Sequence, residues 1–332
     1  MRTRTLLAGL VVVAAASVAE AQCTTGGTAV QDACRKAQDL ISFVTPQLST
    51  ALAGGNPTLG QGGVLGGLGH FSIDIRASAV NGSLPQLNNV GLSVTGATAS
   101  SFTSKNQLVP AASLDAGVGL WRGVSLGVTH VGGVDALVTM TYLPTIDNGS
   151  NSTDVGFKVN GSNTKFGYGV RVGLLEESVV LPGVSFAWVQ RDLPSVTLSG
   201  TVSASGANPG GTLALNDYTI KTSVWRLTAA KNLLIFNFSA GYGQDKYDAT
   251  STISATVNAV APVGTQTGSG PANVSLTRSN LFAGVAINLF LFKLEAEYGQ
   301  VSGGTVTALK NSFGSDPNKS RSYFTLGLRF GR

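Results

Sequence analysis

Two hydrophobic periods divide the chain at Gly69. In the first part, apolar residues recur at the three- and four-residue spacing of a helix: Val30, Ala33, Ala37, Leu40, Ile41, Val44 and Leu48. This spacing predicts an amphipathic helix between Val30 and Leu52. Pro46 lies inside that stretch. Because proline has no amide N–H, it is expected to kink or split the helix.

After Gly69 apolar and polar residues alternate with a period of two, which predicts β-strands. The alternation yields ten of them: His70–Val80, Ser113–Trp121, Val124–Tyr142, Lys165–Leu174, Val184–Ser199, Tyr218–Ala229, Leu233–Tyr247, Leu281–Phe290, Leu291–Val301 and Arg321–Phe330. Several are about ten residues long, whereas strands of soluble sheets usually have about five or six. The third is expected to kink at Gly132-Gly133, and a separate strand at Ser195–Ala204 or Val90–Thr95 would raise the count to twelve.

Short turns and long polar connections alternate between the predicted strands. The long connections are residues 81–110, 144–163, 203–216, 248–277 and 302–319. Barrels of the bacterial outer membrane have an even number of strands, short periplasmic turns and long outer loops. The alternation predicts this topology, with both ends of the barrel on the periplasmic side.

The two faces of the predicted strands differ in chemistry. In the segment from Phe292 to Gly299, one face carries Phe, Leu, Ala and Tyr, and the other carries Lys, Glu and Gly. In a soluble β-sandwich the glycines would face water and weaken the strands. In a membrane barrel the apolar face meets lipid, and glycine and charge fit the narrow lumen. We therefore expect an all-β, antiparallel, up-and-down transmembrane β-barrel of about ten strands, within a range of ten to fourteen, preceded by a short helical segment.

The alternation also predicts which charged side chains face the lumen. The candidates are Asp74, Arg76, Asp115, Lys165, Arg171, Arg191, Lys293, Glu295, Glu297 and Arg329. They would either line a polar channel or form ion pairs that close and stabilise the barrel. A lumen of ten strands is largely filled by side chains, which favours ion pairs.

The first 21 residues have the pattern of a cleaved signal peptide. Arg2 and Arg4 precede an apolar stretch, and Ala19-Glu20-Ala21 matches the small-x-small cleavage site. The expected organisation is a signal peptide at 1–21, a helical cap or plug at 22–62, and the barrel at 63–332. Cys23 and Cys34 are the only cysteines, and in an exported protein they are expected to form a disulfide.

Composition excludes several classes of protein. The mean hydropathy is +0.22, yet no apolar run after residue 21 reaches the roughly 18 residues of a spanning helix, which excludes a helix-bundle membrane protein. Charged residues are only 12% of the chain, and the net charge of +5 is not gathered in a Lys/Arg block, so no nucleic-acid partner is expected. Neither of the two histidines has a partner at metal-ligand spacing, and no cofactor motif is present, so no metal or cofactor is predicted.

The chain resembles bacterial outer-membrane β-barrel proteins in its leader, its strands and its closing segment Tyr323–Phe330, in which aromatic residues alternate. The resemblance implies outer-membrane lipids and the barrel-assembly machinery as partners. Most members of the class end on the aromatic residue, whereas Gly331 and Arg332 follow Phe330 here. Residues 124–144 and 184–194, with the helical stretch, are loosely similar to long-chain fatty-acid and hydrocarbon transport porins, although their N-terminal hatch motif is missing.

The function expected from these features is non-enzymatic. It is porin-like passage, or passage of a small or hydrophobic solute, with surface binding or a structural role through long outer loops as the alternative. An outer-membrane lipase or protease ranks below both. His70-Phe71-Ser72 has the His-x-Ser spacing of outer-membrane phospholipases, but there the pair faces lipid, and here Phe71 takes the lipid face.

Overall fold

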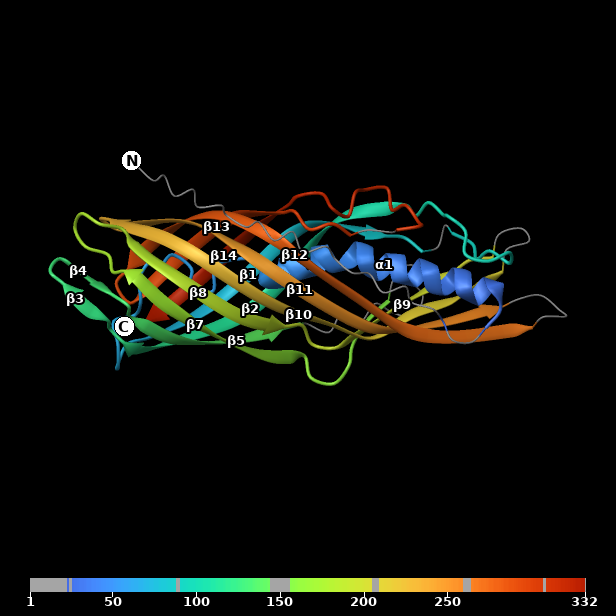
Figure 1. Cartoon of the computed structure of the whole chain (residues 1–332), viewed down its shortest axis with the longest axis horizontal. Coiled ribbons are helices and arrows are strands. Elements are labelled where there is room, and N and C mark those ends of the chain that lie inside the picture. Colours follow the sequence, from blue (N-terminus) through green and yellow to red (C-terminus); the bar gives the residue numbers. More distant parts are fainter. Residues whose placement is uncertain are drawn as a thin grey trace, which may run out of the picture.

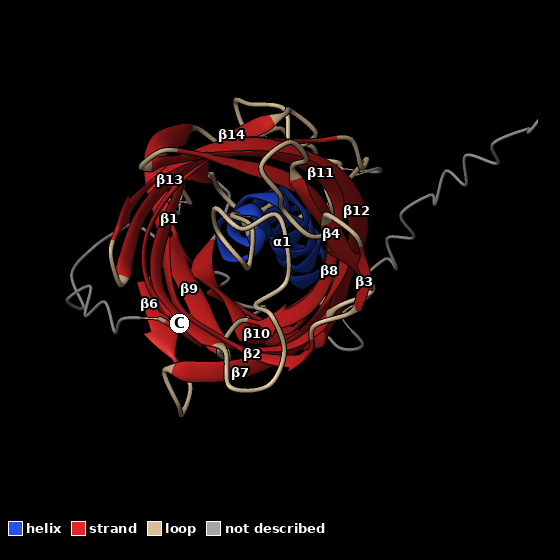
Figure 2. Cartoon of the chain, turned by 90° about the vertical axis from the view of Figure 1, so that its left-hand side faces the viewer, coloured by secondary structure: helices blue, strands red, loops and turns tan. Residues whose placement is uncertain are grey.

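The computed structural model is a closed β-barrel around one helix (Figures 1 and 2). It describes residues 23, 26–87, 90–143, 156–204, 209–258, 264–306 and 309–331. The signal peptide expected at 1–21 lies outside these residues. In the described part of the chain, no helix is both long and apolar enough to cross a membrane.

Ten antiparallel strands close the ring, as predicted. In ring order they are β1 (Phe71–Pro85), β2 (Ser104–Trp121), β5 (Val134–Tyr142), β7 (Thr164–Leu175), β8 (Gly183–Asp192), β10 (Gly210–Leu233), β11 (Phe236–Asn258), β12 (Thr265–Leu289), β13 (Phe292–Ser302) and β14 (Arg321–Gly331). The ring closes where β1 pairs with β14, from Ser72 opposite Gly331 to Val80 opposite Tyr323. We call the end with the short turns the inner end and the opposite end the outer end.

Two of the predicted strands were too long. Val124–Tyr142 is not one kinked strand, because β3 (Val124–Leu126) and β4 (Thr129–Val131) fold back as a hairpin before β5 begins. Gly132 makes the change of direction with a φ of 76°, a conformation that glycine adopts readily.

Val184–Ser199 also divides in two. β8 ends at Asp192, Pro194 follows, and β9 (Val196–Val202) continues along β10 beyond the part that β8 pairs with. The additional strand expected near Ser195–Ala204 is therefore present, but it extends β8 within the barrel wall and does not add a strand to the ring. It pairs with the outer part of β10 and with β6 (Gly156–Val159).

The helix α1 (Thr28–Ala53) lies inside the barrel along its axis (Figures 1 and 2). Of the two effects expected of Pro46, a kink or a split, the split does not occur, because α1 is one continuous element. Strand side chains pack around the helix, so tertiary contacts compensate for the hydrogen bond that Pro46 cannot make.

The strands β10, β11 and β12 keep one inside–outside alternation along their length, but the polarity of the two faces inverts partway. On β11 the outward residues are apolar from Phe236 to Tyr242 and polar from Gln244 to Thr256. The inward residues change in the opposite sense, from Asn237–Asp245 to the mainly apolar set Tyr247–Val257. The inner part of the barrel therefore has an apolar exterior, and the outer part has a polar exterior around an apolar core.

This inversion corrects the loop predicted at 248–277. β11 runs to Asn258 and β12 resumes at Thr265. A run of Thr, Ser and small residues indicates a loop if lipid is expected outside. It suits a strand whose outer face meets water, since threonine favours strands. The loops predicted at 81–110 and 203–216 are shortened in the same way by β1, β2 and β10.

Candidate functional site in the barrel lumen

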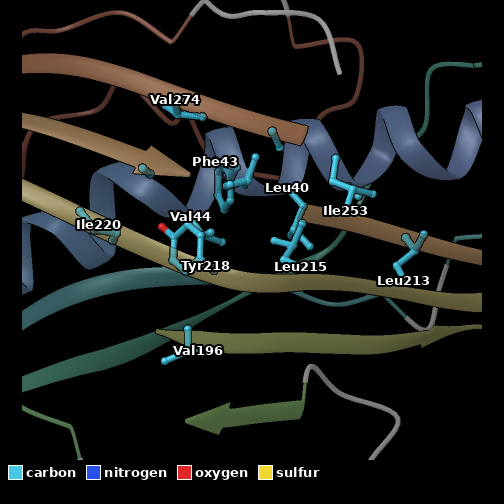
Figure 3. Packing of buried hydrophobic residues seen from close by; sticks show 14 of the residues in the cluster. Leu40, Phe43, Val44, Val196, Leu213, Leu215, Tyr218, Ile220, Ile253 and Val274 are labelled. Carbon is cyan, nitrogen blue, oxygen red and sulfur yellow. The ribbon is translucent and has the colours of Figure 1, made fainter. Parts of the chain in front are cut away.

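The outer half of the lumen is filled by apolar contacts between α1 and the strands around it. Figure 3 shows Leu40, Phe43 and Val44 of the helix among buried residues of β10, β11 and β12. Those labelled on the strands include Leu213, Leu215, Tyr218, Ile253 and Val274. Burial of apolar surface on both sides stabilises the helix in this place.

Buried carboxylates bind α1 to two outer connections. Asp32 accepts hydrogen bonds from the amides of Ser93 (2.7 Å) and Thr98 (2.8 Å) and pairs with Lys36. These amides belong to the connection between β1 and β2. The N-terminal half of the helix is thus fixed at the outer end.

Asp39, seven residues after Asp32 in α1, makes equivalent contacts with a second connection. It accepts hydrogen bonds from the amides of Lys310 and Asn311 and from the Asn311 side chain, at 2.7–2.8 Å, and pairs with Arg35 at 3.2 Å. Desolvation by burial outweighs these contacts and raises the pKa of Asp39 above its ordinary value. The connection between β13 and β14 is therefore held against α1 at Lys310 and Asn311.

Further contacts fix the helix along its length. Phe43 stacks on Phe313, and Phe313 on Phe102, with ring centroids 4.5 and 5.0 Å apart. The hydroxyls of Thr45 and Tyr218 lie 3.0 Å apart. At the start of the helix, a disulfide joins Cys23 to Cys34, the pair expected from the sequence.

The inner half of the lumen is filled by residues 54–69, which continue from α1 towards β1. Charged side chains of the strands bind the backbone of this stretch. Arg76 donates to the carbonyl oxygen of Asn56 (3.0 Å), and the amide of Asn56 donates to Glu297 (2.9 Å). Lys293 donates to the carbonyl oxygen of Gly60 (3.1 Å), and Arg329 to that of Leu59.

The same side chains pair with one another. Asp115 lies between Arg76 (3.1 Å) and Arg191 (3.3 Å). Arg329 contacts Asp74 (2.7 Å) and Glu295 (3.6 Å). The structure thus brings together most of the predicted lumen candidates.

Arg171 and Lys165 complete the set of candidates. The guanidinium of Arg171 is fully buried and pairs with Asp135. Lys165 is exposed and takes no part in these contacts.

Sequence reasoning missed several buried charges of the strands, among them Asp135, Arg226 and Asp245. Asp135 pairs with Arg171 and accepts a hydrogen bond from the amide of Leu65 (3.1 Å). Arg226 pairs with Asp245 and donates to the carbonyl oxygen of Ala53 (3.3 Å). Their inward position follows from the alternation along β5, β10 and β11, which was the available signal. The partner of each depends on the register between neighbouring strands, which places Asp135 opposite Arg171.

Two cavities lie at opposite ends of the barrel. The inner one has a volume of about 350 Å³ and is lined in part by Gly60–Leu65, Lys293 and Arg329. The outer one, of about 430 Å³, is an open depression formed by Ser101 and residues 309–317. They share no lining residue.

The His-x-Ser element shows no catalytic arrangement. Ser72 is buried on the lumen side, and His70 is exposed at the inner end. In the part of the chain that the structure describes, no hydrogen bond joins the two side chains.

Exposed aromatic residues on the barrel exterior indicate the class of protein to which this barrel belongs. Exposed rings lie towards both ends of the apolar exterior: Phe71, Phe236, Phe292 and Phe330 close to the short turns, and Tyr168, Tyr242, Tyr298 and Phe324 towards the outer edge. A closed antiparallel barrel with an apolar, aromatic-bordered exterior and a charged interior is a transmembrane β-barrel of the bacterial outer-membrane class.

Comparisons with known proteins stand beside this geometry. No protein-family model and no curated protein matches the chain. Among solved structures, it is similar to Ail, the attachment invasion locus protein of Yersinia pestis, with 14% identity over 80% of this chain and 99% of that one, at a TM-score of 0.22.

Two further solved structures are similar to the chain at low identity. The TodX deltaS2S3 mutant monoaromatic hydrocarbon channel is 8% identical over 85% of this chain and 94% of that one, with a TM-score of 0.23. OprB of Pseudomonas putida is 7% identical over 80% of this chain and 94% of that one, with a TM-score of 0.18. The class of the protein therefore rests on its own geometry.

Proposed function

We propose that this protein is an outer-membrane barrel that is closed by its own N-terminal segment and acts at its outer end as a binding protein. The observation that carries the proposal is the occupied lumen. α1 fills the outer half through apolar contacts, and residues 54–69 fill the inner half through contacts with charged strand residues.

The contacts of α1 support a permanent closure. Asp32 and Asp39 are buried carboxylates whose donors lie in two separate outer connections. Withdrawal of the helix would break both sets and expose the apolar core of the outer half. The loss of the partner of a buried charge typically costs about 3–5 kcal/mol, because the remaining charge is left uncompensated.

The outer end offers the surface for binding. The outer parts of β10, β11 and β12, with β9 and β6, extend beyond the apolar exterior and carry polar residues outward. Such a surface is reached from outside the cell if the chain is exported through the leader at 1–21 and inserted by the barrel-assembly machinery. Lipids of the outer membrane would then surround the inner part.

Passage of a small hydrophobic solute is the second candidate. It is favoured by the apolar lining around α1, which would suit such a solute if the helix moved aside. In that case Asp32 and Asp39 would be contacts that open and close during transport.

Conductance in planar bilayers separates the two candidates. The purified protein is expected to give no steady conductance. A variant lacking residues 28–65, and the double variant Asp32→Ala/Asp39→Ala, should give conducting events, because the closing segment is removed or loosened. Asp248→Ala, which alters a carboxylate on the outer surface of β11, should remain silent. Steady conductance or solute flux through the unaltered protein would favour passage.

A further inference from the structure

The inner end of the barrel exposes large apolar side chains at its short turns. Val179, Leu234 and Phe290 are 96%, 98% and 99% exposed, and each lies in a different connection between strands. Val128, at the tip of the β3–β4 hairpin, is 76% exposed. Apolar side chains exposed to this extent are unfavourable on a surface in contact with water.

The height of the apolar exterior shows what surrounds these tips. Its outer boundary lies between Tyr242 and Gln244 on β11 and between Tyr298 and Gln300 on β13, where outward residues become polar. The turns at Leu234 and Phe290 come eight to nine residues further in. At about 3.3 Å per residue and a tilt of about 40°, that distance is roughly 20 Å along the barrel axis. The apolar band of an outer-membrane barrel is about 25 Å tall, so it extends past the turns.

Several backbone groups near the turns are paired within the protein, which lowers the cost of an apolar surrounding. The ammonium of Lys231 donates to the carbonyl oxygens of Ser178, Val179 (3.0 Å) and Leu181 (3.2 Å). The amide of Asn288 donates to the carbonyl oxygen of Ile235 (2.8 Å). These bonds need no water.

Charges near the turns are also paired. Lys231 lies 3.8 Å from Glu177, and Glu176 pairs with His130 at 2.6 Å. Glu176 and Glu177 line the inner cavity. Val179, Leu234 and Phe290 form the exposed tips of their turns, and Phe290 also borders the inner cavity, whereas Arg122 before β3 is a charged side chain 59% exposed at this end.

We propose that the short turns at the inner end are immersed in the inner leaflet of the membrane, with phospholipid acyl chains covering Val179, Leu234 and Phe290. Each turn adjoins the lipid-facing exterior of the two strands that it joins: β7 and β8 at Val179, β10 and β11 at Leu234, and β12 and β13 at Phe290. The inner rim is thus a lipid-binding surface, and the water of the inner compartment reaches the protein through the cavity beside Lys293 and Arg329.

Spin labels at single new cysteines test this proposal. Both native cysteines are in the disulfide, so Leu234→Cys and Phe290→Cys each provide one free thiol. In phospholipid vesicles containing only this protein, collisions with oxygen, which concentrates in lipid, are compared with collisions with a water-soluble nickel complex. Ala240→Cys on the lipid-facing part of β11 and Thr252→Cys on its outer part are the references.

Labels at 234 and 290 are expected to match the label at 240, with high oxygen and low nickel accessibility, and to differ from the label at 252. Labels at 234 and 290 that match 252 would overturn the proposal and leave the rim for a partner other than lipid. As a second measurement, Leu234→Asp should lower the fraction that folds into vesicles several-fold, while Thr252→Asp should not. Equal folded fractions would also contradict immersion.

Discussion

Asp135 and Arg171 show how single residues close the lumen. Both side chains are fully buried, the Arg171 Nε lies 2.8 Å from Asp135, and the carboxylate also accepts the amide of Leu65. One carboxylate thus joins β5, β7 and the stretch that follows α1. A buried pair of this kind is not in itself evidence of high stability, but the loss of one partner leaves an uncompensated charge.

Asp135→Ala is therefore expected to destabilise the folded barrel by about 3–5 kcal/mol. Urea unfolding in detergent micelles, followed by tryptophan fluorescence, measures this cost. The control is Asp248→Ala, which removes a half-exposed pair with Lys246 and should cost about 0–1 kcal/mol. Equal costs for the two variants would show that the lumen around Asp135 is hydrated.

At the scale of elements, the inversion of polarity along β10, β11 and β12 separates a lipid-facing part from a water-facing part. Leu294 on β13 and Thr252 on β11 both point outward, yet their surroundings differ. Leu294→Arg should cost about 2–4 kcal/mol if this position is near the midplane of the bilayer. Thr252→Arg should be neutral, because its side chain is in water. Folding titrations in vesicles measure both, and a neutral Leu294→Arg would refute the lipid-facing assignment.

The disulfide belongs to the helix as an element. Cys23 and Cys34 close a loop with a sequence separation of 11 around the first turns of α1. Cys23→Ser/Cys34→Ser should reduce stability by about 2–3 kcal/mol. Amide hydrogen exchange should become faster over residues 28–35, while residues 40–53, held by contacts in the lumen, keep their protection. Unchanged exchange at the start of the helix would show that Asp32 alone holds it.

For the whole molecule, a barrel in lipid implies a characteristic behaviour. The protein should be recovered in the outer-membrane fraction, and it should migrate differently in gels before and after heating, because a closed hydrogen-bonded ring resists detergent until it is heated. Recovery as a folded, detergent-free soluble protein would be incompatible with the apolar exterior.

The alternation predicted the ten-stranded ring, because it reports directly which side of a strand is apolar. It also pointed to Asp74, Arg171 and Arg329, which the structure has buried. The alternation could not identify Asp135 as the partner of Arg171, because the pattern of one strand does not contain its register with the next strand. The outer part of β11 was missed because its Thr-rich outward face has the composition of a loop. The sequence did not decide whether α1 caps or plugs the barrel. An amphipathic pattern shows which side of a helix is apolar, but not which residues pack against that side.

Accessibility along the outward face of β11 tests the central claim, a closed barrel whose exterior changes from lipid to water partway up its strands. Single cysteines at Phe238, Ala240, Lys246, Thr250, Thr252 and Thr256 would be reacted with a charged, water-soluble thiol reagent in vesicles. We expect slow reaction at 238 and 240 and fast reaction at every position from 246 outward, with one sharp change between Tyr242 and Lys246. Uniformly fast reaction along the strand would contradict the account.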